Sequence, residues 1–195
     1  MTALTRKGSL LMAHRIISVF GGSSPRPGSP AYEGAYTVGR LLAEAGYTVA
    51  TGGFTGVMEA ASRGAAEAGG HVIGVTTDVL NQWEAQDNRA NAWVKEEIRF
   101  PTLRERLYHL VAFCDAAVAL PGGIGTLSEV SFMWSLLQTG EIAPKPLLLL
   151  GRQWQDLLKQ FYGQGEYIRP EHMQLLRCLQ TPEEIITALN GEVVR

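Results

Sequence analysis

Cysteines and long apolar runs are scarce in this 195-residue chain, and each scarcity excludes a class of protein. Two cysteines, Cys114 and Cys178, are too few for a disulfide framework and lack the CxxC spacing of a zinc or redox site. No apolar stretch approaches the roughly 20 residues that a membrane-spanning helix needs. The first residues show no apolar core followed by a cleavage site, as a signal peptide would. We therefore expect a cytoplasmic protein with no membrane partner.

The chain also has no large excess of positive or negative residues. The chain has 17 Lys and Arg against 19 Asp and Glu, so it lacks the basic balance of a protein that binds nucleic acid through a charged face. Its four histidines show no metal-ligand spacing, and we expect no metal. With 46% hydrophobic residues, the composition suits a compact fold of ordinary size. We expect residues 1–13 to be a flexible tail and residues 14–195 to be a single domain.

Apolar segments alternate with helical patterns along the chain. The segments are continuous in their apolar character, which is typical of strands covered on both faces. They lie at 16–20, 47–51, 71–75, 116–120 and 146–150, and helical patterns cover 29–46, 56–70 and 126–140. This order predicts βαβ units, and hence an α/β fold: a Rossmann-like, doubly wound parallel β-sheet with helices on both faces. Residues 76–100 are expected to form a long loop with a short strand at 93–100.

Glycine-rich turns follow three of these predicted strands and open the three helices. They read GGSSPRPGSP from residue 21, GGFTGVM from residue 52 and PGGIGTLSE from residue 121. One such turn alone is as well explained by a tight bend that needs glycine. Three at the carboxyl edge of a parallel sheet favour a ligand site, because helix N-termini present unpaired N–H groups to an anion. The turns supply the substrate-binding candidates Gly22, Ser23, Ser24, Gly52, Gly53, Gly56, Gly122, Gly123, Ile124, Gly125 and Thr126.

Glu129 has two readings. Thr126-Leu127-Ser128-Glu129 has the T-x-x-E spacing of a capping box, in which the glutamate accepts a hydrogen bond from the N–H of the cap residue. A carboxylate in the first turn of a phosphate-binding helix would also reach the sugar attached to that phosphate. Spacing alone leaves both roles open.

At this point the residues resemble a known family. PGGIGTLSE is similar to the PGGxGTxxE signature of the LOG (Lonely Guy) proteins, cytokinin-activating phosphoribohydrolases once misnamed lysine decarboxylases. VFGGSSP, from Val19, and the segment from Gly52 to Val75 resemble two further family motifs. By this resemblance Arg106 falls on the catalytic arginine of the family. Arg104 falls on a family histidine and is a further substrate-binding candidate. Arg104 has an alternative role in a surface ion pair.

The sequence departs from the family pattern at Thr51, Glu59, Thr77 and Leu107. The resemblance implies a hydrolase that cleaves the N-glycosidic bond of AMP or an N6-substituted AMP, releasing free base and ribose 5-phosphate. Glu129 and Arg106 are then catalytic, and the nucleotide is the small-molecule partner. The departures at Thr51 and Leu107 favour the alternative, a nucleotide- or molybdenum-cofactor-binding carrier without turnover. Retention of Glu129 and Arg106 favours the enzyme.

No cofactor is expected. Pyridoxal-dependent decarboxylation needs a Schiff-base lysine in the site, and none of the four lysines lies in a glycine turn. The helix at 126–140 is apolar on more than one face, which predicts that a second copy covers it. A homodimer agrees with the dimers that the resemblance implies.

Overall fold

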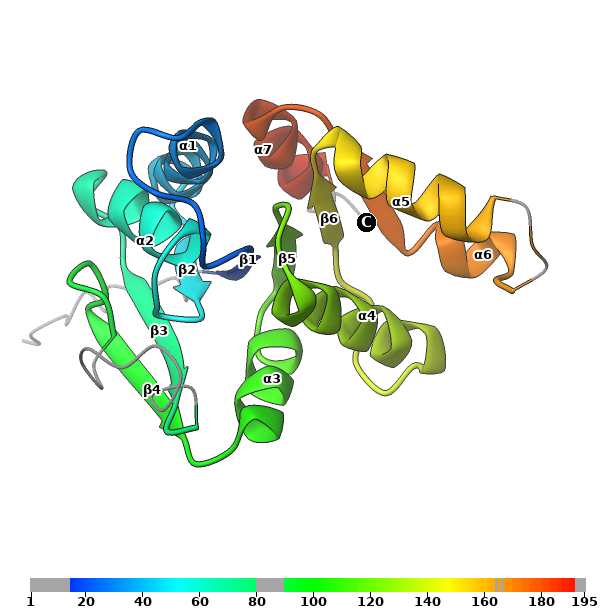
Figure 1. The fold of residues 1–195 in the computed structure, drawn as a ribbon, viewed down its shortest axis with the longest axis horizontal. Coiled ribbons are helices and arrows are strands. Elements are labelled where there is room, and N and C mark those ends of the chain that lie inside the picture. The colour runs from blue at the N-terminus through cyan, green and yellow to red at the C-terminus, as the bar shows by residue number, and fades with distance from the viewer. Residues whose placement is uncertain (1–14, 80–89, 164, 166, 192–195) are drawn as a thin grey trace, which may run out of the picture.

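Parallel strands form the centre of the computed structural model, which describes residues 15–79, 90–163, 165 and 167–191. Within these residues, seven strands form one sheet in the order β4-β3-β2-β1-β5-β6-β7 (Figure 1). The strands are β1 (Ile16–Phe20), β2 (Thr48–Thr51), β3 (Val72–Thr77), β4 (Glu96–Phe100), β5 (Ala116–Ala119), β6 (Leu147–Leu150) and β7 (Leu176–Leu179). The helices are α1 (Pro30–Glu44), α2 (Val57–Glu67), α3 (Leu103–Ala112), α4 (Ile124–Thr139), α5 (Arg152–Tyr162), α6 (Pro170–Met173) and α7 (Pro182–Gly191).

Helices cover both faces of the sheet, which confirms the doubly wound prediction. Helices α1, α2 and α7 pack on one face and α3, α4 and α5 on the other (Figure 1). Neighbouring residues of a strand enter opposite cores: Val49 packs with the first set of helices and Ala50 with the second. This explains why the central strand segments carry mostly apolar residues on both faces, with a few buried hydroxyl side chains such as Ser18 and Thr51.

The strand order reverses between β1 and β5. From β1 the chain crosses to β2 on one side, whereas β5 pairs with the other side of β1 through Ile17↔Ala116 and Phe20↔Ala119. Connections that leave in opposite directions open a crevice at the carboxyl ends of the two strands, and open α/β sheets bind their ligands there.

The predicted strands and helices are found with small shifts at their ends. Ser29 is the N-cap of α1, and its Oγ accepts from the N–H of Tyr32 at 3.3 Å. The short strand expected within 93–100 is β4. Strand β7 was not predicted, because LRCL is only partly buried at the sheet edge and carries an arginine.

Some predictions fall outside the described residues. The flexible tail at 1–13 does so entirely, and the long loop at 76–100 does so for residues 80–89. In the described part of that loop, β3 continues to Thr77 and β4 begins at Glu96. No helix in the described part of the chain combines the length and the apolarity needed to cross a membrane.

Candidate active site

The glycine turns meet at a cavity of about 280 Å³ at the carboxyl ends of β1 and β5. Residues from the turns after β1, β2 and β5 line it, together with residues from α2, α3 and α4. They are Gly21, Gly22, Ser23, Phe54, Met58, Arg106, Gly123, Ile124, Gly125, Thr126 and Glu129. The cavity therefore contains the two residues that the family resemblance marks as catalytic.

Arg106 is buried in α3 with its guanidinium directed at the ends of neighbouring strands. Its Nε donates to the carbonyl oxygen of Val75 at 2.8 Å, and its Nη2 donates to that of Gly52 at 3.2 Å. The ring of Phe54 lies 5.7 Å from the guanidinium carbon, within the range of a cation–π contact. Burial lowers the pKa of Arg106, but a guanidinium stays protonated at neutral pH. A fixed positive charge thus sits at the floor of the cavity.

Glu129 faces this charge from α4. Its Oε1 lies 3.9 Å from Nη1 of Arg106, and the residue is 8% exposed. Burial raises the pKa of Glu129 to about 7, and the Coulomb attraction of Arg106 opposes that rise. A carboxyl group with a pKa near neutrality can exchange a proton during a reaction at physiological pH.

The capping-box reading of Glu129 is wrong, and so is its expected place in the first turn. Helix α4 begins at Ile124, with Gly123 as N-cap and no side-chain cap. Thr126 is therefore the third helical residue, and Glu129 lies in the second turn. The helix starts early because Gly123 has an extended backbone, φ −86° and ψ −157°, which already suits an N-cap. Glu129 points into the cavity instead of capping the helix.

The start of α4 offers N–H groups to an anion. The first hydrogen bond of the helix runs from the N–H of Leu127 to the carbonyl of Gly123 at 3.0 Å, so the amides of the three residues between them precede the helical ladder. Gly123 and Gly125 each face open space where a Cβ would stand. Gly122 is packed: a Cβ there would collide with Thr126 Oγ1 and lie 2.7 Å from the Gly22 nitrogen.

Other predicted residues support the cavity without lining it. A Cβ on Gly52 would collide with Nη2 of Arg106. Gly53 and Gly56 adopt φ of +78° and +70°, conformations that favour glycine. Gly122 packs closely against the backbone of Gly22, so the PGG turn and the turn after β1 are in contact at this point.

Ser24 and Arg104 are both exposed and do not line the cavity. Gly21, Phe54 and Met58 do line it and were not predicted as site residues. All three lie within or beside the glycine turns, so proximity to those turns was the signal available.

The departures from the family pattern fit the structure locally. Thr51 Oγ1 accepts from the N–H of Gly53 at 3.1 Å and pairs with Ser62 Oγ at 3.0 Å. Glu59 accepts from the hydroxyl of Tyr32 at 3.3 Å. Leu107 packs against the core under α3 and does not line the cavity.

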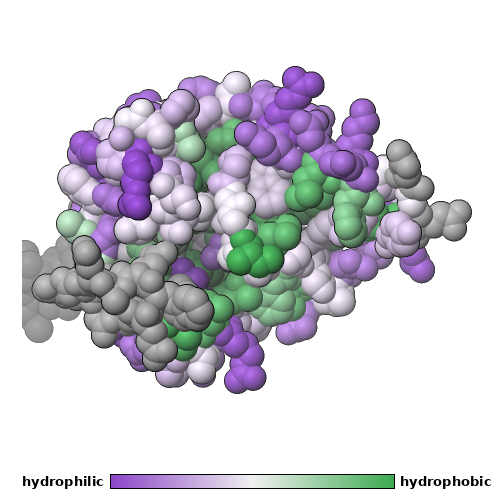
Figure 2. Space-filling model, viewed as in Figure 1, coloured by the Kyte–Doolittle hydropathy of each residue, from purple (hydrophilic) through white to green (hydrophobic). Residues whose placement is uncertain are grey.

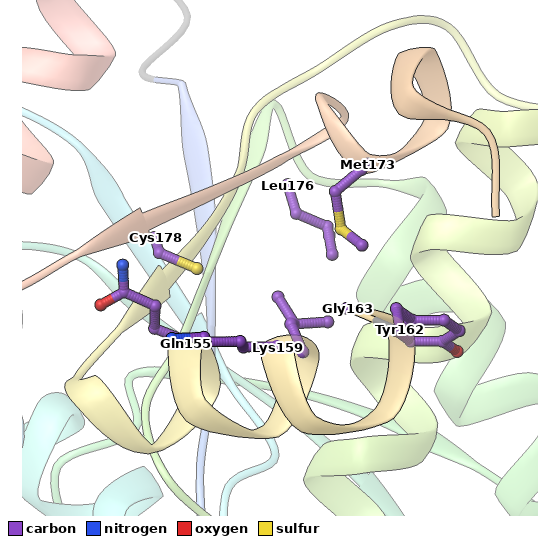
Figure 3. A pocket seen from close by; sticks show the side chains of 8 residues that line it. Gln155, Lys159, Tyr162, Gly163, Met173, Leu176 and Cys178 are labelled. Atoms are coloured by element: carbon purple, nitrogen blue, oxygen red, sulfur yellow. The ribbon is translucent and has the colours of Figure 1, made fainter. Parts of the chain in front are cut away.

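Two further cavities lie along α5. One, of about 280 Å³, opens between α5, α6 and β7, where Figure 3 shows Leu176, Met173 and Cys178 facing Lys159 and Tyr162. It contains none of the predicted site residues. The other, of about 390 Å³, borders the PGG turn and is lined by Pro121, Gly122, Gly123, Ile124, Leu127, Gln153, Trp154 and Leu157. In Figure 2, hydrophobic surface gathers in the region between the start of α4 and α5, where Ile124, Leu127 and Leu157 are exposed.

Among the described residues, no group of three His, Cys, Asp or Glu side chains could hold a metal ion. Of the described lysines, none lines the cavity. Lys145 donates to the carbonyls of Ala112 and Cys114, and Lys95 donates to that of Gly70.

A family model and several known proteins are similar to this chain in sequence. A family model described as "Possible lysine decarboxylase" matches residues 58–189. The chain is 34% identical over 187 residues to a probable cytokinin riboside 5'-monophosphate phosphoribohydrolase of Oryza sativa subsp. japonica, covering 92% of this chain and 73% of that protein. It is 35% identical over 144 residues to a cytokinin riboside 5'-monophosphate phosphoribohydrolase of Arabidopsis thaliana, covering 72% of this chain and 61% of that protein.

Solved structures share the fold. The molybdenum cofactor binding protein from the phototrophic bacterium Rippkaea orientalis matches with a TM-score of 0.72 and 27% identity, covering 94% of this chain and 99% of that chain. The arrangement of helices on both faces of one sheet is therefore shared with that protein.

Proposed function

The chain belongs to the LOG family, and on that premise we propose that it is a nucleoside 5′-monophosphate phosphoribohydrolase. Its substrate would be AMP or an N6-substituted AMP, and its products the free base and ribose 5-phosphate. The observation that carries the proposal is the buried pair of Arg106 and Glu129, 3.9 Å apart, in the same cavity as the first amides of α4.

The α4 amides would bind the 5′-phosphate. The N–H groups of Gly125 and Thr126 point toward the helix N-terminus, where the partial positive charge of the helix dipole favours an anion. Gly123 lets the phosphate approach the backbone, because no atom lies within 4 Å of a Cβ at that position. Phe54 and Met58 give the cavity an apolar side for the base.

Glu129 would act on the ribose. Cleavage breaks the bond between C1′ and the base nitrogen, whose electron pair leaves with the base, and positive charge develops on the sugar. An ionised Glu129 stabilises that charge and accepts a proton from the water that attacks C1′. The base nitrogen takes up a proton, so nucleotide and water give free base and ribose 5-phosphate in balance.

Arg106 would favour the ionised form of Glu129, which is the form that reacts. Its positive charge opposes the rise in the pKa of Glu129, so that a substantial fraction of the carboxyl is ionised at neutral pH. The anchoring of the guanidinium to two backbone carbonyls holds that charge in place before the substrate arrives.

A second candidate is a carrier that binds a nucleotide or the molybdenum cofactor without turnover. It is favoured by the similarity to the Rippkaea orientalis protein and by Leu107, which packs into the core where the family pattern has a lysine. Retention of both Glu129 and Arg106 in one cavity favours the enzyme.

One assay separates the two candidates. Purified protein is incubated with AMP and with N6-substituted AMPs, and free base is measured by chromatography. Base released by the natural chain and lost in Glu129→Gln supports the hydrolase. Tight nucleotide binding with no base released from any of them supports the carrier.

We also propose a cytoplasmic homodimer that binds no nucleic acid. The reason for the dimer changes with the structure, because this chain itself buries Val130, Met133, Trp134, Leu136 and Leu137 of α4. Ile124 and Leu127 remain exposed at the start of α4, and an aromatic cluster is exposed beside this helix. Tyr108 is 41% and Phe113 is 62% exposed, and the Tyr108 ring lies 6.4 Å from that of Phe132.

A further inference from the structure

Residues 90–95 lie against the turn that follows β2, and Asn91 makes the contact. Its backbone N–H donates to the carbonyl of Gly53 at 2.8 Å, and its side-chain Nδ2 donates to the carbonyl of Phe54 at 3.0 Å. Its Oδ1 accepts from the N–H of Trp93 at 3.2 Å, which is an Asx-turn. One asparagine thus bonds both to its own segment and to the turn.

The same turn is held from its other side. The N–H of Gly53 donates to Thr51 Oγ1 at 3.1 Å, so the peptide groups on both sides of Gly53 have side-chain or segment partners. Gly53 itself needs φ +78°, a conformation that few residues adopt and that its neighbours must maintain.

This turn is also the support of Arg106. The carbonyl of Gly52 accepts from Nη2 at 3.2 Å, and the ring of Phe54 lies 5.7 Å from the guanidinium carbon. The contacts form a continuous path from Asn91 through the turn to the guanidinium, and from there across 3.9 Å to Glu129.

We propose that Asn91 is a positioning residue: it holds the turn Gly52–Phe54 in the conformation that keeps the Arg106 guanidinium against Glu129. Asparagine suits this role because its carboxamide accepts one hydrogen bond and donates another at the same time. The kinetic consequence rests on the proposed function, whereas the structural consequence does not.

The structural consequence is a change in the titration of Glu129. Among the residues that the structure describes, Arg106 is the charged side chain that lines the cavity with Glu129. The turn after β1, the turn after β2 and α2 contribute Gly21, Gly22, Ser23, Phe54 and Met58, which are uncharged. Coulomb energy varies inversely with separation, so at an effective dielectric constant of about 20 a retreat of the guanidinium by about 1 Å raises the pKa of Glu129 by roughly half a unit.

The variant Asn91→Ser tests this inference in the protein without ligand. Serine keeps an oxygen that can form the local turn, but it is too short to reach the carbonyl of Phe54. Lys95→Gln is the matched control, because it removes one side-chain hydrogen bond of the same segment, from Nζ to the carbonyl of Gly70 at 2.8 Å. The measurement is the NMR titration of the Glu129 carboxyl in the natural chain and both variants.

We expect the pKa of Glu129 to rise by roughly half a unit in Asn91→Ser and to stay unchanged in Lys95→Gln. Phe54→Leu, which removes the ring from Arg106, should raise it as well, and Asn91→Ser added to Phe54→Leu should give less than the sum of the two. An unchanged titration in Asn91→Ser, or fully additive shifts, overturns the inference.

The kinetic measurement is separate. If the natural chain releases base, Asn91→Ser should lower kcat at pH 7 several-fold and move the acid limb of the pH profile to higher pH, leaving KM nearly unchanged. A lower kcat with an unmoved profile contradicts positioning. If no nucleotide is hydrolysed, the proposed function fails while the NMR titration still decides the role of Asn91.

Discussion

Arg106 on α3 and Glu129 on α4 face each other, and Nη1 of the arginine lies 3.9 Å from Oε1 of the glutamate. The guanidinium donates its shorter hydrogen bonds to the carbonyls of Val75 and Gly52. The carboxyl group therefore receives the attraction of the charge without a short hydrogen bond from it. Burial outweighs that attraction, and the pKa of Glu129 rises to about 7.

Glu129→Gln should abolish most of the turnover. The amide keeps the size of the side chain but has neither the negative charge that stabilises the ribose cation nor the ability to accept a proton from water. We expect base release to fall by about 100-fold or more, the scale of one acid–base or electrostatic group. A variant that releases base at a near-normal rate would leave Glu129 without a catalytic role.

The same variant should change how stability depends on pH. The pKa of Glu129 is raised on folding from its usual 4.5 to about 7, so the natural chain loses stability as pH rises through that interval. The loss reaches about 3 kcal/mol above pH 7, and Glu129→Gln lacks it. Thermal denaturation should show the variant gaining stability relative to the natural chain between pH 5 and pH 8. A constant difference would mean that Glu129 titrates normally.

Arg106→Met should move the pH profile of activity. Without the positive charge, the pKa of Glu129 rises further, so the acid limb of kcat/KM shifts to higher pH and activity at pH 7 falls. Arg106→Lys keeps a charge but lacks the planar fork that bonds both carbonyls, and we expect a smaller shift. Activity that instead falls as pH rises through 7 would make Glu129 an acid and contradict its role as base.

The 5′-phosphate should dominate binding. Charge-assisted hydrogen bonds contribute about 1.5–3 kcal/mol each, so adenosine, which lacks two or three of them, should bind Glu129→Gln at least roughly 100-fold more weakly than AMP does. Calorimetric titration of this variant measures both affinities without turnover, and sulfate should compete with AMP. Equal affinities for nucleoside and nucleotide would remove the anion site from the PGG turn.

Two glycines of that turn should respond differently to substitution. Gly123→Val places its side chain in open space beside the α4 amides, so AMP binding should be lost while the changed helix cap costs about 1 kcal/mol or less of stability. Gly122→Ala brings a Cβ against Thr126 and Gly22 and should destabilise the fold by about 1–3 kcal/mol. Calorimetric titration and thermal denaturation of both variants make the comparison. Unimpaired AMP binding in Gly123→Val would contradict the approach of the phosphate to the backbone at Gly123.

Light scattering at micromolar concentration should show a dimer. Phe113→Glu, which puts a charge in the exposed aromatic cluster beside α4, should give a folded monomer. Phe161→Glu is the matched control, because Phe161 is 66% exposed on α5, outside that cluster. A monomeric natural chain, or equal effects of the two changes, would contradict a dimer through this surface.

The sequence by itself determined the architecture and the edge of the sheet at which ligands would bind. Continuous apolar segments separated by glycine-terminated helical patterns are local signals, and they identify a parallel sheet covered on both faces. Glycine turns at the strand ends fix where the helix N-termini gather. Glu129 and Arg106 could be named only through the resemblance of their motifs to a family.

Tertiary structure alone decided the chemistry of those residues. The pKa of Glu129 depends on the water that packing excludes and on the distance to a guanidinium from another helix, and neither quantity is present in local sequence. The spacing T-x-x-E was misleading, because backbone geometry at Gly123 started α4 early and carried Glu129 into the second turn. Asn91 could not be predicted, because its contacts join segments that only the folded chain brings together. Phe54 and Met58 lie within or beside a glycine turn, but only the fold shows that they line the cavity.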